Sequence, residues 1–159
     1  ARHTIVEGGK ERFNSVKNGI EALSDAVDLI AVQDGVRPFA SQAMIRRTAE
    51  CAKASGAAIP VITPVDSFRR IDGNSQDSSL INRDSLRIVQ TPQIFEAALL
   101  RAAYDTDFDT RFTDDASVVE AFGHKITLCE GERTNIKITT PDDMAFAEAI
   151  IETKKQADL

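Results

Sequence analysis

The predicted loops of this chain together hold one carboxylate, several cations and several hydroxyls, a mixture that suits a phosphorylated ligand. The clearest case is Asp34–Pro38, where Asp34 and Arg37 directly follow an apolar stretch. Cations and hydroxyls bind phosphate oxygens well, and a carboxylate can hold Mg2+. The candidate residues of this kind are Asp34, Arg37, Ser67, Arg69, Arg70, Thr91 and Lys137.

Each of these residues, taken singly, also fits an ordinary structural role. An Asp-Gly pair such as Asp34-Gly35 is a common turn former. Arg37 fits a surface ion pair, and Lys137 fits a solvated lysine at the end of a short strand. A binding site is therefore indicated only if the fold brings these loops together.

The elements that must position these loops alternate between strand and helix. Short apolar runs predict strands at Thr4–Val6, Asp28–Gln33, Ala57–Val65, Lys125–Glu130 and Asn135–Thr139. Helical periodicity and capping residues predict helices at Lys10–Leu23, from Ser41 to about Ser55, at Phe95–Tyr104, at Asp114–Phe122 and from Thr140 onward. The alternation indicates an α/β layer fold with a mostly parallel sheet, in which ligands bind at the carboxyl ends of the strands.

The segment from about residue 66 to residue 87 departs from this alternation. It is polar, has few core residues and contains the turn signal Asp72-Gly73-Asn74. We expect an extended hairpin that projects from the body, although a surface loop without regular structure would have a similar composition.

Length and composition narrow the class of protein. The chain has 159 residues and a formal net charge of −6, which suits one domain and argues against a protein that coats nucleic acid. Its longest apolar runs are shorter than a membrane span requires. The two cysteines, Cys51 and Cys129, lie far apart in sequence, which argues against a disulfide framework or a zinc ribbon and favours a cytoplasmic protein.

Seven motifs along the chain form a recognisable series. They are Val6–Arg12 with Ser15-Val16, Val32–Phe39, Pro64–Arg70, Asn82–Leu86, Gln90–Gln93, Phe112–Ser117 and Asn135–Asp143. The series resembles that of the cytidylyltransferases that act on polyol phosphates, above all the 2-C-methyl-D-erythritol 4-phosphate branch of isoprenoid biosynthesis. The resemblance implies a three-layer, Rossmann-like nucleotidyltransferase fold. It also implies transfer of a cytidylyl group from CTP to the polyol phosphate, with Mg2+ as cofactor and pyrophosphate as product.

The resemblance also implies roles for individual residues. Lys137 matches the lysine at the α-phosphate, and Asp34 and Arg37 match the loop that borders the reacting phosphates, with Asp34 near Mg2+. Thr91 and Thr113 match hydroxyls of the substrate pocket. The residues that match the cytosine-reading part are Gly8, Gly9 and Ser15.

The projecting segment acquires a role from the same resemblance. In the family an arm reaches across a twofold axis and lends residues to the neighbouring active site, which implies a homodimer. Ser67 and Arg83 match the donated residues, although Ser67 stands where the family more often has Thr. Arg69 and Gln33 also replace a more usual Lys and His, which leaves the reaction intact but weakens detailed statements about substrate contacts.

The start of the chain differs from the family pattern. Enzymes of this family begin with a strand that leads into a Gly-rich loop holding the triphosphate of CTP, and no such motif is found here. We therefore expect residues 1–159 to be the C-terminal part of a single nucleotidyltransferase domain, with an unpaired sheet edge.

Three other functions remain open at this point. A ribitol 5-phosphate cytidylyltransferase shares most of the motifs. A non-catalytic module that binds a nucleotide or a partner would preserve the fold without the activity. A sugar nucleotidyltransferase that uses UTP or GTP is less consistent with the motif Gln90–Gln93.

Overall fold

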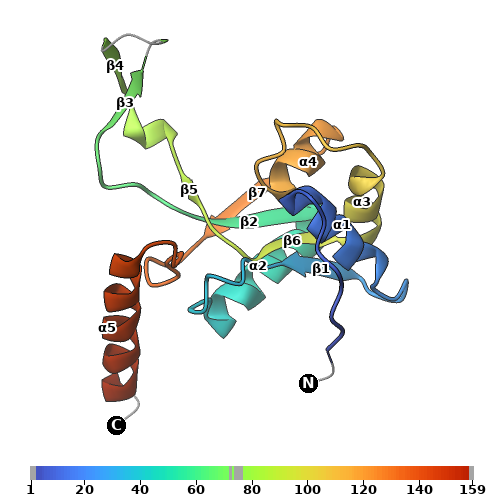
Figure 1. Ribbon diagram of the computed structural model, residues 1–159, viewed down its shortest axis with the longest axis horizontal. Helices are drawn as coiled ribbons and strands as arrows, with labels where there is room; N and C mark the ends of the chain where they lie inside the picture. Colours follow the sequence, from blue (N-terminus) through green and yellow to red (C-terminus); the bar gives the residue numbers. More distant parts are fainter. Residues whose placement is uncertain (1–2, 72, 74–76, 158–159) are drawn as a thin grey trace.

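The computed structural model of the protein describes residues 3–71, 73 and 77–157 (Figure 1). Its main sheet has five strands, which are β1 (Leu29–Val32), β2 (Ala57–Ile62), β5 (Ile88–Val89), β6 (Gln93–Glu96) and β7 (Thr127–Glu130). β6 lies between β1 and β2, β5 pairs with the end of β2, and β7 lies along the opposite edge of β2. At Ala58, for example, β2 is flanked by Ile94 on one side and Thr127 on the other.

The sheet is mixed, which corrects the expectation of a mostly parallel one. β2 is parallel to β7 but antiparallel to β5 and β6, and β1 is antiparallel to β6. Parallel neighbours need a crossover connection, usually a helix. Between β2 and β6 the described chain has a hairpin and the short 3-10 turn Arg83–Ser85 but no α-helix, so β5 and β6 return in the opposite direction. The α/β class itself is confirmed.

Helices cover both faces of the main sheet (Figure 1). Helices α1 (Arg12–Glu21), α3 (Ala97–Tyr104) and α4 (Asp115–Ala121) pack on one face, and α2 (Gln42–Ser55) packs on the other. Successive strand residues point to opposite faces, so Phe95 joins the first core while Ile94 joins the second. This double burial explains the almost continuous apolar run of β2.

The local signals for two helix ends are confirmed. The Ser41 hydroxyl accepts a hydrogen bond from the Met44 amide at 3.0 Å, and α2 ends at Gly56, whose φ of 83° favours glycine. Asp114 caps α4, and its carboxylate accepts from the Ser117 amide at 2.9 Å. The last helix, α5, spans Pro141–Ala157. No helix in the described ranges is long and apolar enough to cross a membrane.

Two predicted strands are absent from the described structure. Thr4–Val6 forms no strand, and Ile5 is 90% exposed. Asn135–Thr139 forms none either, although the Ile138 amide donates to the Val36 carbonyl at 2.9 Å. A strand needs a neighbouring backbone to complete its hydrogen bonds, and apolar composition alone does not provide one.

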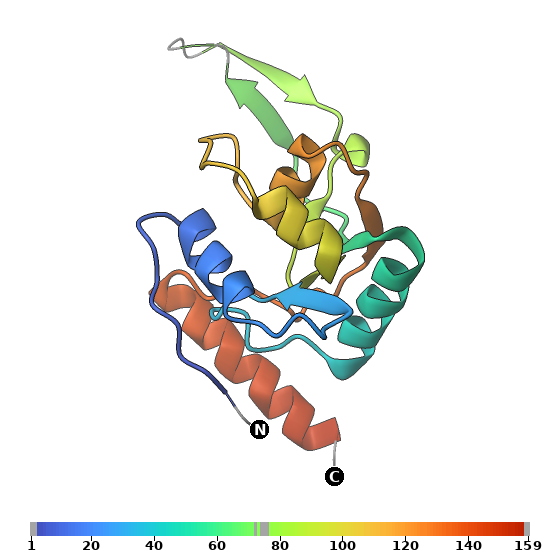
Figure 2. The ribbon, with the colours of Figure 1, turned by 90° about the vertical axis from the view of Figure 1, so that its right-hand side faces the viewer.

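The projecting segment forms a two-stranded antiparallel sheet of β3 (Phe68–Ile71) and β4 (Ser78–Ile81). Figures 1 and 2 show it standing away from the main sheet. The expected turn residues Asp72 and Asn74 lie outside the described residues, whereas Gly73 has a φ of 66°.

A buried charge joins helices α1, α3 and α4. The fully buried Asp115 carboxylate accepts two hydrogen bonds from the Arg12 guanidinium, at 3.0 and 2.6 Å, and one from the Tyr104 hydroxyl at 2.6 Å. Burial and the adjacent Asp115 charge raise the pKa of Tyr104. Burial acts to lower the pKa of Arg12, but the hydrogen bonds and charge of Asp115 outweigh it and raise that pKa. The Phe13 ring stacks on Tyr104, with centroids 4.7 Å apart.

Replacing Asp115 is expected to destabilise the fold strongly. Asp115→Ala removes the partner of the Arg12 guanidinium and leaves the buried Tyr104 hydroxyl without its acceptor, and an unpaired buried group of this kind costs about 1 to 3 kcal/mol of unfolding free energy. Urea denaturation followed by circular dichroism measures the loss. The exposed pair of Asp109 and Arg111 provides the matched control, because Asp109→Ala should leave the midpoint almost unchanged. Equal shifts of the urea midpoint in the two variants would contradict the stabilising role of the buried Asp115 carboxylate.

Candidate active site

A hollow of about 310 Å3 lies beyond the carboxyl end of β1 and brings four separate loops together. Five of the predicted site residues line it, and they come from four segments of the chain. The full lining is Arg12, Asp34, Arg37, Val89, Gln90, Thr91, Gln93, Thr113, Asp114 and Lys137. The fold therefore gathers Asp34, Arg37, Thr91, Thr113 and Lys137 in one place.

Asp34 lies at the centre of three cations. Its carboxylate is 3.2 Å from the Lys137 ammonium, 3.4 Å from the Arg37 Nε and 3.9 Å from the Arg12 Nη2. The Asp34 side chain is 15% exposed, so these interactions are only partly screened by water. The carboxylate balances positive charges that would otherwise repel one another.

Arg37 is held in place from several directions. Its amide donates to the Asp34 carbonyl at 3.0 Å, which closes a tight turn, so the turn-forming and ion-pair roles of this loop coexist. The guanidinium donates to the Asn135 carbonyl at 2.9 Å and to the Val89 carbonyl at 3.3 Å. Gln33 donates to the Arg37 carbonyl at 2.7 Å. The Arg37 charge thus has little freedom to leave the hollow.

The two threonines occupy different environments. Thr91 is buried, and its hydroxyl accepts a hydrogen bond from the Asp34 amide at 3.0 Å, which ties the Asp34 loop to the segment between β5 and β6. Thr113 is exposed at the rim, next to Asp114. Buried Gln93 fixes that rim, because its amide donates to Asp114 at 2.8 Å and accepts from the Ala116 amide at 2.9 Å.

Gly8, Gly9 and Ser15 form a cluster of their own. The Gly9 amide donates to the Ser15 hydroxyl at 2.9 Å, and a Cβ at Gly9 would lie 2.2 Å from Asn14 Cβ, so this position requires glycine. None of the three lines the hollow, but Arg12, which does, lies between them in sequence.

Ser67 and Arg83 are not part of this hollow. Both are exposed, and both lie at the base of the projecting hairpin. An Arg83 N–H donates to the Val65 carbonyl, which holds the side chain against the hairpin base.

Sequence reasoning missed several residues that build the site. Arg12, Gln90, Gln93 and Asp114 line the hollow, and Arg12 adds a third cation. Arg12 is the first residue of helix α1 and closely follows Gly8 and Gly9. This position next to a candidate ligand loop is the one local signal that could have indicated Arg12. The burial of Gln90 and Gln93 depends on distant contacts, which no local pattern encodes.

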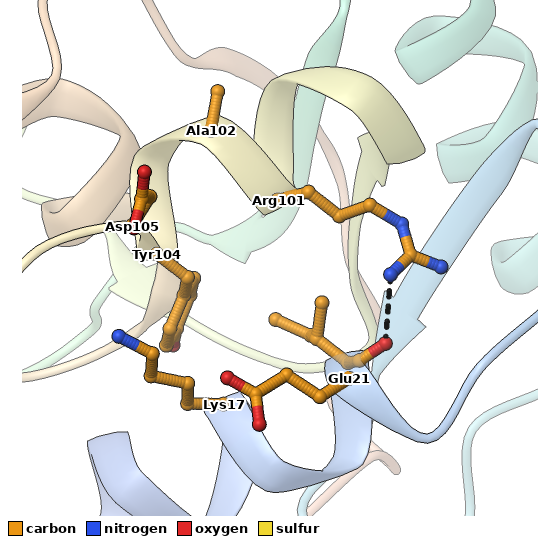
Figure 3. A pocket seen from close by; sticks show the side chains of 7 residues that line it. Lys17, Glu21, Arg101, Ala102, Tyr104 and Asp105 are labelled. Atoms are coloured by element: carbon orange, nitrogen blue, oxygen red, sulfur yellow. Dashed lines mark hydrogen bonds between the residues drawn. The ribbon is translucent and has the colours of Figure 1, made fainter. Parts of the chain in front are cut away.

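A second hollow, of about 380 Å3, lies between α1 and α3 (Figure 3). The two cationic side chains that line it already form hydrogen bonds within the protein. Arg101 donates to the carbonyls of Ile20, Leu23 and Ser24, and Lys17 donates to the Thr106 carbonyl. None of the predicted site residues lines it, and its arginine satisfies carbonyls around the C-terminal end of α1.

Comparisons with known proteins identify the family of the chain. The model of the 2-C-methyl-D-erythritol 4-phosphate cytidylyltransferase family matches residues 1–153. The protein of that name from Bacteroides fragilis is 47% identical over 150 residues, which cover 94% of this chain and 67% of the relative. The one from Alkaliphilus metalliredigens is 38% identical over 97% of this chain and 65% of its own length. The chain thus spans about two thirds of the length of these relatives.

Solved structures give the same result. The 2-C-methyl-D-erythritol 4-phosphate cytidylyltransferase of Thermus thermophilus is similar with a TM-score of 0.80 and 38% identity, over 92% of this chain and 72% of that one. The 4-diphosphocytidyl-2C-methyl-D-erythritol synthase of Anaerococcus prevotii has a TM-score of 0.81 and 34% identity, over 91% and 68%. The chain belongs to the 2-C-methyl-D-erythritol 4-phosphate cytidylyltransferase family.

Proposed function

We propose that the full-length protein transfers a cytidylyl group from CTP to 2-C-methyl-D-erythritol 4-phosphate and releases pyrophosphate. The observation that carries this proposal is the convergence of Arg12, Arg37 and Lys137 on Asp34 in a hollow of nucleotide-fragment size. Three cations beside hydroxyls suit two anionic reactants that must approach each other. The family names support the choice of substrate.

In the proposed reaction, a phosphate oxygen of the acceptor attacks the α-phosphorus of CTP. A new P–O bond forms there while the bond from the α-phosphorus to the bridging oxygen of the β-phosphate breaks, and pyrophosphate leaves with that electron pair. The acceptor oxygen is already anionic, so the step needs no general base. Lys137, which is 47% exposed, can turn from Asp34 to the α-phosphate, where negative charge builds in the transition state. Arg37 contacts the same phosphates from its fixed position.

The residues present fit a Mg2+ ion that is shared with the triphosphate. In the described ranges no cluster of three or more His, Cys, Asp or Glu side chains could hold a metal by itself. Mg2+ in nucleotide sites is commonly held by one or two carboxylates together with phosphate oxygens and water. Asp34 would provide the carboxylate, and the ion would neutralise phosphate charge. Gly8, Gly9 and Ser15 would contact the cytosine, and the hydrogen bond from the Gly9 amide to the Ser15 hydroxyl keeps these residues together.

The proposal includes a homodimer in which residues 66–87 form an exchanged arm. Ser67 and Arg83 lie outside the hollow of their own chain, which supports a role in a partner's site. The arm also exposes apolar side chains, with Leu80 72% and Ile71 61% exposed. An isolated two-stranded sheet is only marginally stable, so contact with a partner would stabilise it.

Two finer statements belong to the same proposal. The coverage of both sheet faces by helices supports a Rossmann-like, three-layer nucleotidyltransferase fold, of which residues 1–159 would be the C-terminal part. The free thiols Cys51 and Cys129 support a reducing compartment such as the cytoplasm.

The activity itself can be tested by pyrophosphate release from CTP in the presence of Mg2+. The full-length protein should release pyrophosphate with 2-C-methyl-D-erythritol 4-phosphate and not with ribitol 5-phosphate. Release with ribitol 5-phosphate alone would keep the mechanism and change the substrate. Silence with both acceptors would leave a nucleotide-binding module without this activity.

Removing the Lys137 charge should slow the chemical step. Lys137→Ala is expected to lower kcat about 100- to 1000-fold with little change in KM, because the charge matters most in the transition state. Steady-state kinetics with both substrates varied separates the two constants. Lys155→Ala on α5, where Lys155 pairs with Glu152, provides the control and should behave like the wild type. A rise in KM alone would disprove the proposed role.

The exchanged arm predicts complementation between two inactive variants. A mixed dimer of Arg83→Ala and Lys137→Ala chains contains one site with both wild-type residues, so random mixing should restore about a quarter of the wild-type activity. Co-expression of the two differently tagged chains, followed by assay of the mixture, measures the recovery. If Arg83 served its own chain, mixing would restore nothing.

A further inference from the structure

Asn135 is a buried polar residue at the junction of the loops that build the candidate site. It is fully buried, although it lies in a segment without regular secondary structure. Its side-chain Nδ2 donates to the Thr91 carbonyl at 2.9 Å. Its carbonyl accepts from Arg37 at 2.9 Å and from Gln90 at 3.3 Å, and its amide donates to the Glu132 carbonyl at 3.0 Å. One residue therefore contacts three separate segments.

The contact with Thr91 connects Asn135 to the central carboxylate. The Thr91 hydroxyl accepts from the Asp34 amide at 3.0 Å, so the Asp34 loop and Asn135 are both attached to Thr91. Lys137 follows Asn135 by two residues, and its ammonium lies 3.2 Å from the Asp34 carboxylate. The residue after Lys137 is also anchored, because the Ile138 amide donates to the Val36 carbonyl at 2.9 Å. Lys137 thus lies between two anchors, of which Asn135 is the buried one.

The chemistry of Asn135 indicates that its side-chain amide is needed. Its Oδ1 is buried and has no hydrogen-bond partner among the described residues. A buried acceptor without a partner destabilises a fold, and an apolar side chain of similar size would avoid that loss. An apolar side chain could not make the two hydrogen bonds of Nδ2, one to the Thr91 carbonyl at 2.9 Å and a weaker one to the Met44 sulfur at 3.8 Å. Only the first of them ties Asn135 to the loops of the candidate site.

We infer that Asn135 is a positioning residue that holds Lys137 in place relative to Asp34. It acts through the Nδ2–Thr91 hydrogen bond and touches neither substrate in the proposed reaction. The inference rests on the proposed function for the catalytic meaning of Lys137, whereas the positioning itself is a property of the protein without substrates. Substitution of the side chain leaves the backbone carbonyl that Arg37 contacts. It should therefore change the position of Lys137 more than that of Arg37.

A double-mutant cycle in the full-length protein tests whether Asn135 acts through Lys137. Asn135→Ala should lower kcat on the order of 100-fold, because small misplacements of a reacting group have effects of that size. In a Lys137→Ala background the same substitution should lower kcat by less than about twofold, since the group that it positions is gone. Losses that simply multiply would overturn the inference.

A matched control separates positioning from general destabilisation. Thr48 is also fully buried, and its hydroxyl donates to the Met44 carbonyl within α2, away from the hollow. Thr48→Ala should change kcat little, and by the same factor in both backgrounds. If Asn135→Ala fails to fold, Asn135→Leu fills the space, removes the unpartnered Oδ1 and still lacks the donor to Thr91. It should fold, which a thermal melt checks, and it should show the same non-additivity with Lys137→Ala.

A measurement without turnover tests the positioning directly. The lysines can be dimethylated with 13C-formaldehyde, and the Lys137 signal is identified by its loss in Lys137→Arg. In Asn135→Ala or Asn135→Leu this signal should move toward that of freely solvated lysines, while in Thr48→Ala it should stay in place. An unmoved Lys137 signal would overturn the inference. A wild-type protein that released no pyrophosphate would overturn only the proposed function, because the signal would still decide the role of Asn135.

Discussion

The charge of Asp34 is the interaction on which the candidate site depends. Three cations within 4 Å of one carboxylate are stable together only because that carboxylate offsets their mutual repulsion. The same arrangement suits the proposed function. In that proposal a phosphate that entered the hollow would replace Asp34 as the partner of Lys137 or Arg37, and the carboxylate would then be available to a divalent cation.

The cations reach Asp34 from distant parts of the chain, and contacts with other segments hold the two arginines. Arg12 is fixed by Asp115, and Arg37 by the carbonyls of Asn135 and Val89. Asp34 itself is fixed through the Thr91 hydroxyl. Buried polar groups of this kind stabilise a structure only when they are hydrogen-bonded. The geometry of the hollow therefore depends on the packing of the core around it, and the core depends on these hydrogen bonds.

Local sequence signals predicted a large part of this structure. Helix α2 lies where Ser41 and Gly56 indicated, α4 begins after Asp114, and two strands form within the polar segment. These elements depend on capping and turn chemistry, which acts over a few residues. The expected parallel sheet was wrong, because the direction of a strand depends on the connection that precedes it and not on its composition. Strand β6 itself was not predicted, since a helix was expected from Phe95 onward. Thr4–Val6 and Asn135–Thr139 have the composition of strands but no strand partner in the described structure.

Most charges of the candidate site were predictable from the sequence, whereas the residues that support them were not. Polar residues in loops between apolar strands indicated Asp34, Arg37, Lys137 and Thr91, and the family resemblance added Thr113, but the cation Arg12 was missed. The supporting residues were not visible. Asp115, Gln93 and Asn135 are polar types that are usually exposed, and their burial follows from contacts between segments far apart in sequence.

The net charge of −6 does not conflict with anionic substrates. At physiological ionic strength, charges more than about 8 Å away in solvent are largely screened, so a ligand in the hollow is governed by its immediate neighbours. In the hollow, two carboxylates offset most of the positive charge: Asp34 and Asp114 lie beside the cations Arg12, Arg37 and Lys137. Arg12 also pairs with the buried Asp115 carboxylate. Any strong binding of two phosphorylated reactants therefore needs further positive charge. Under the proposed function, a divalent cation would supply part of this charge, and Arg83 from a second chain would supply more.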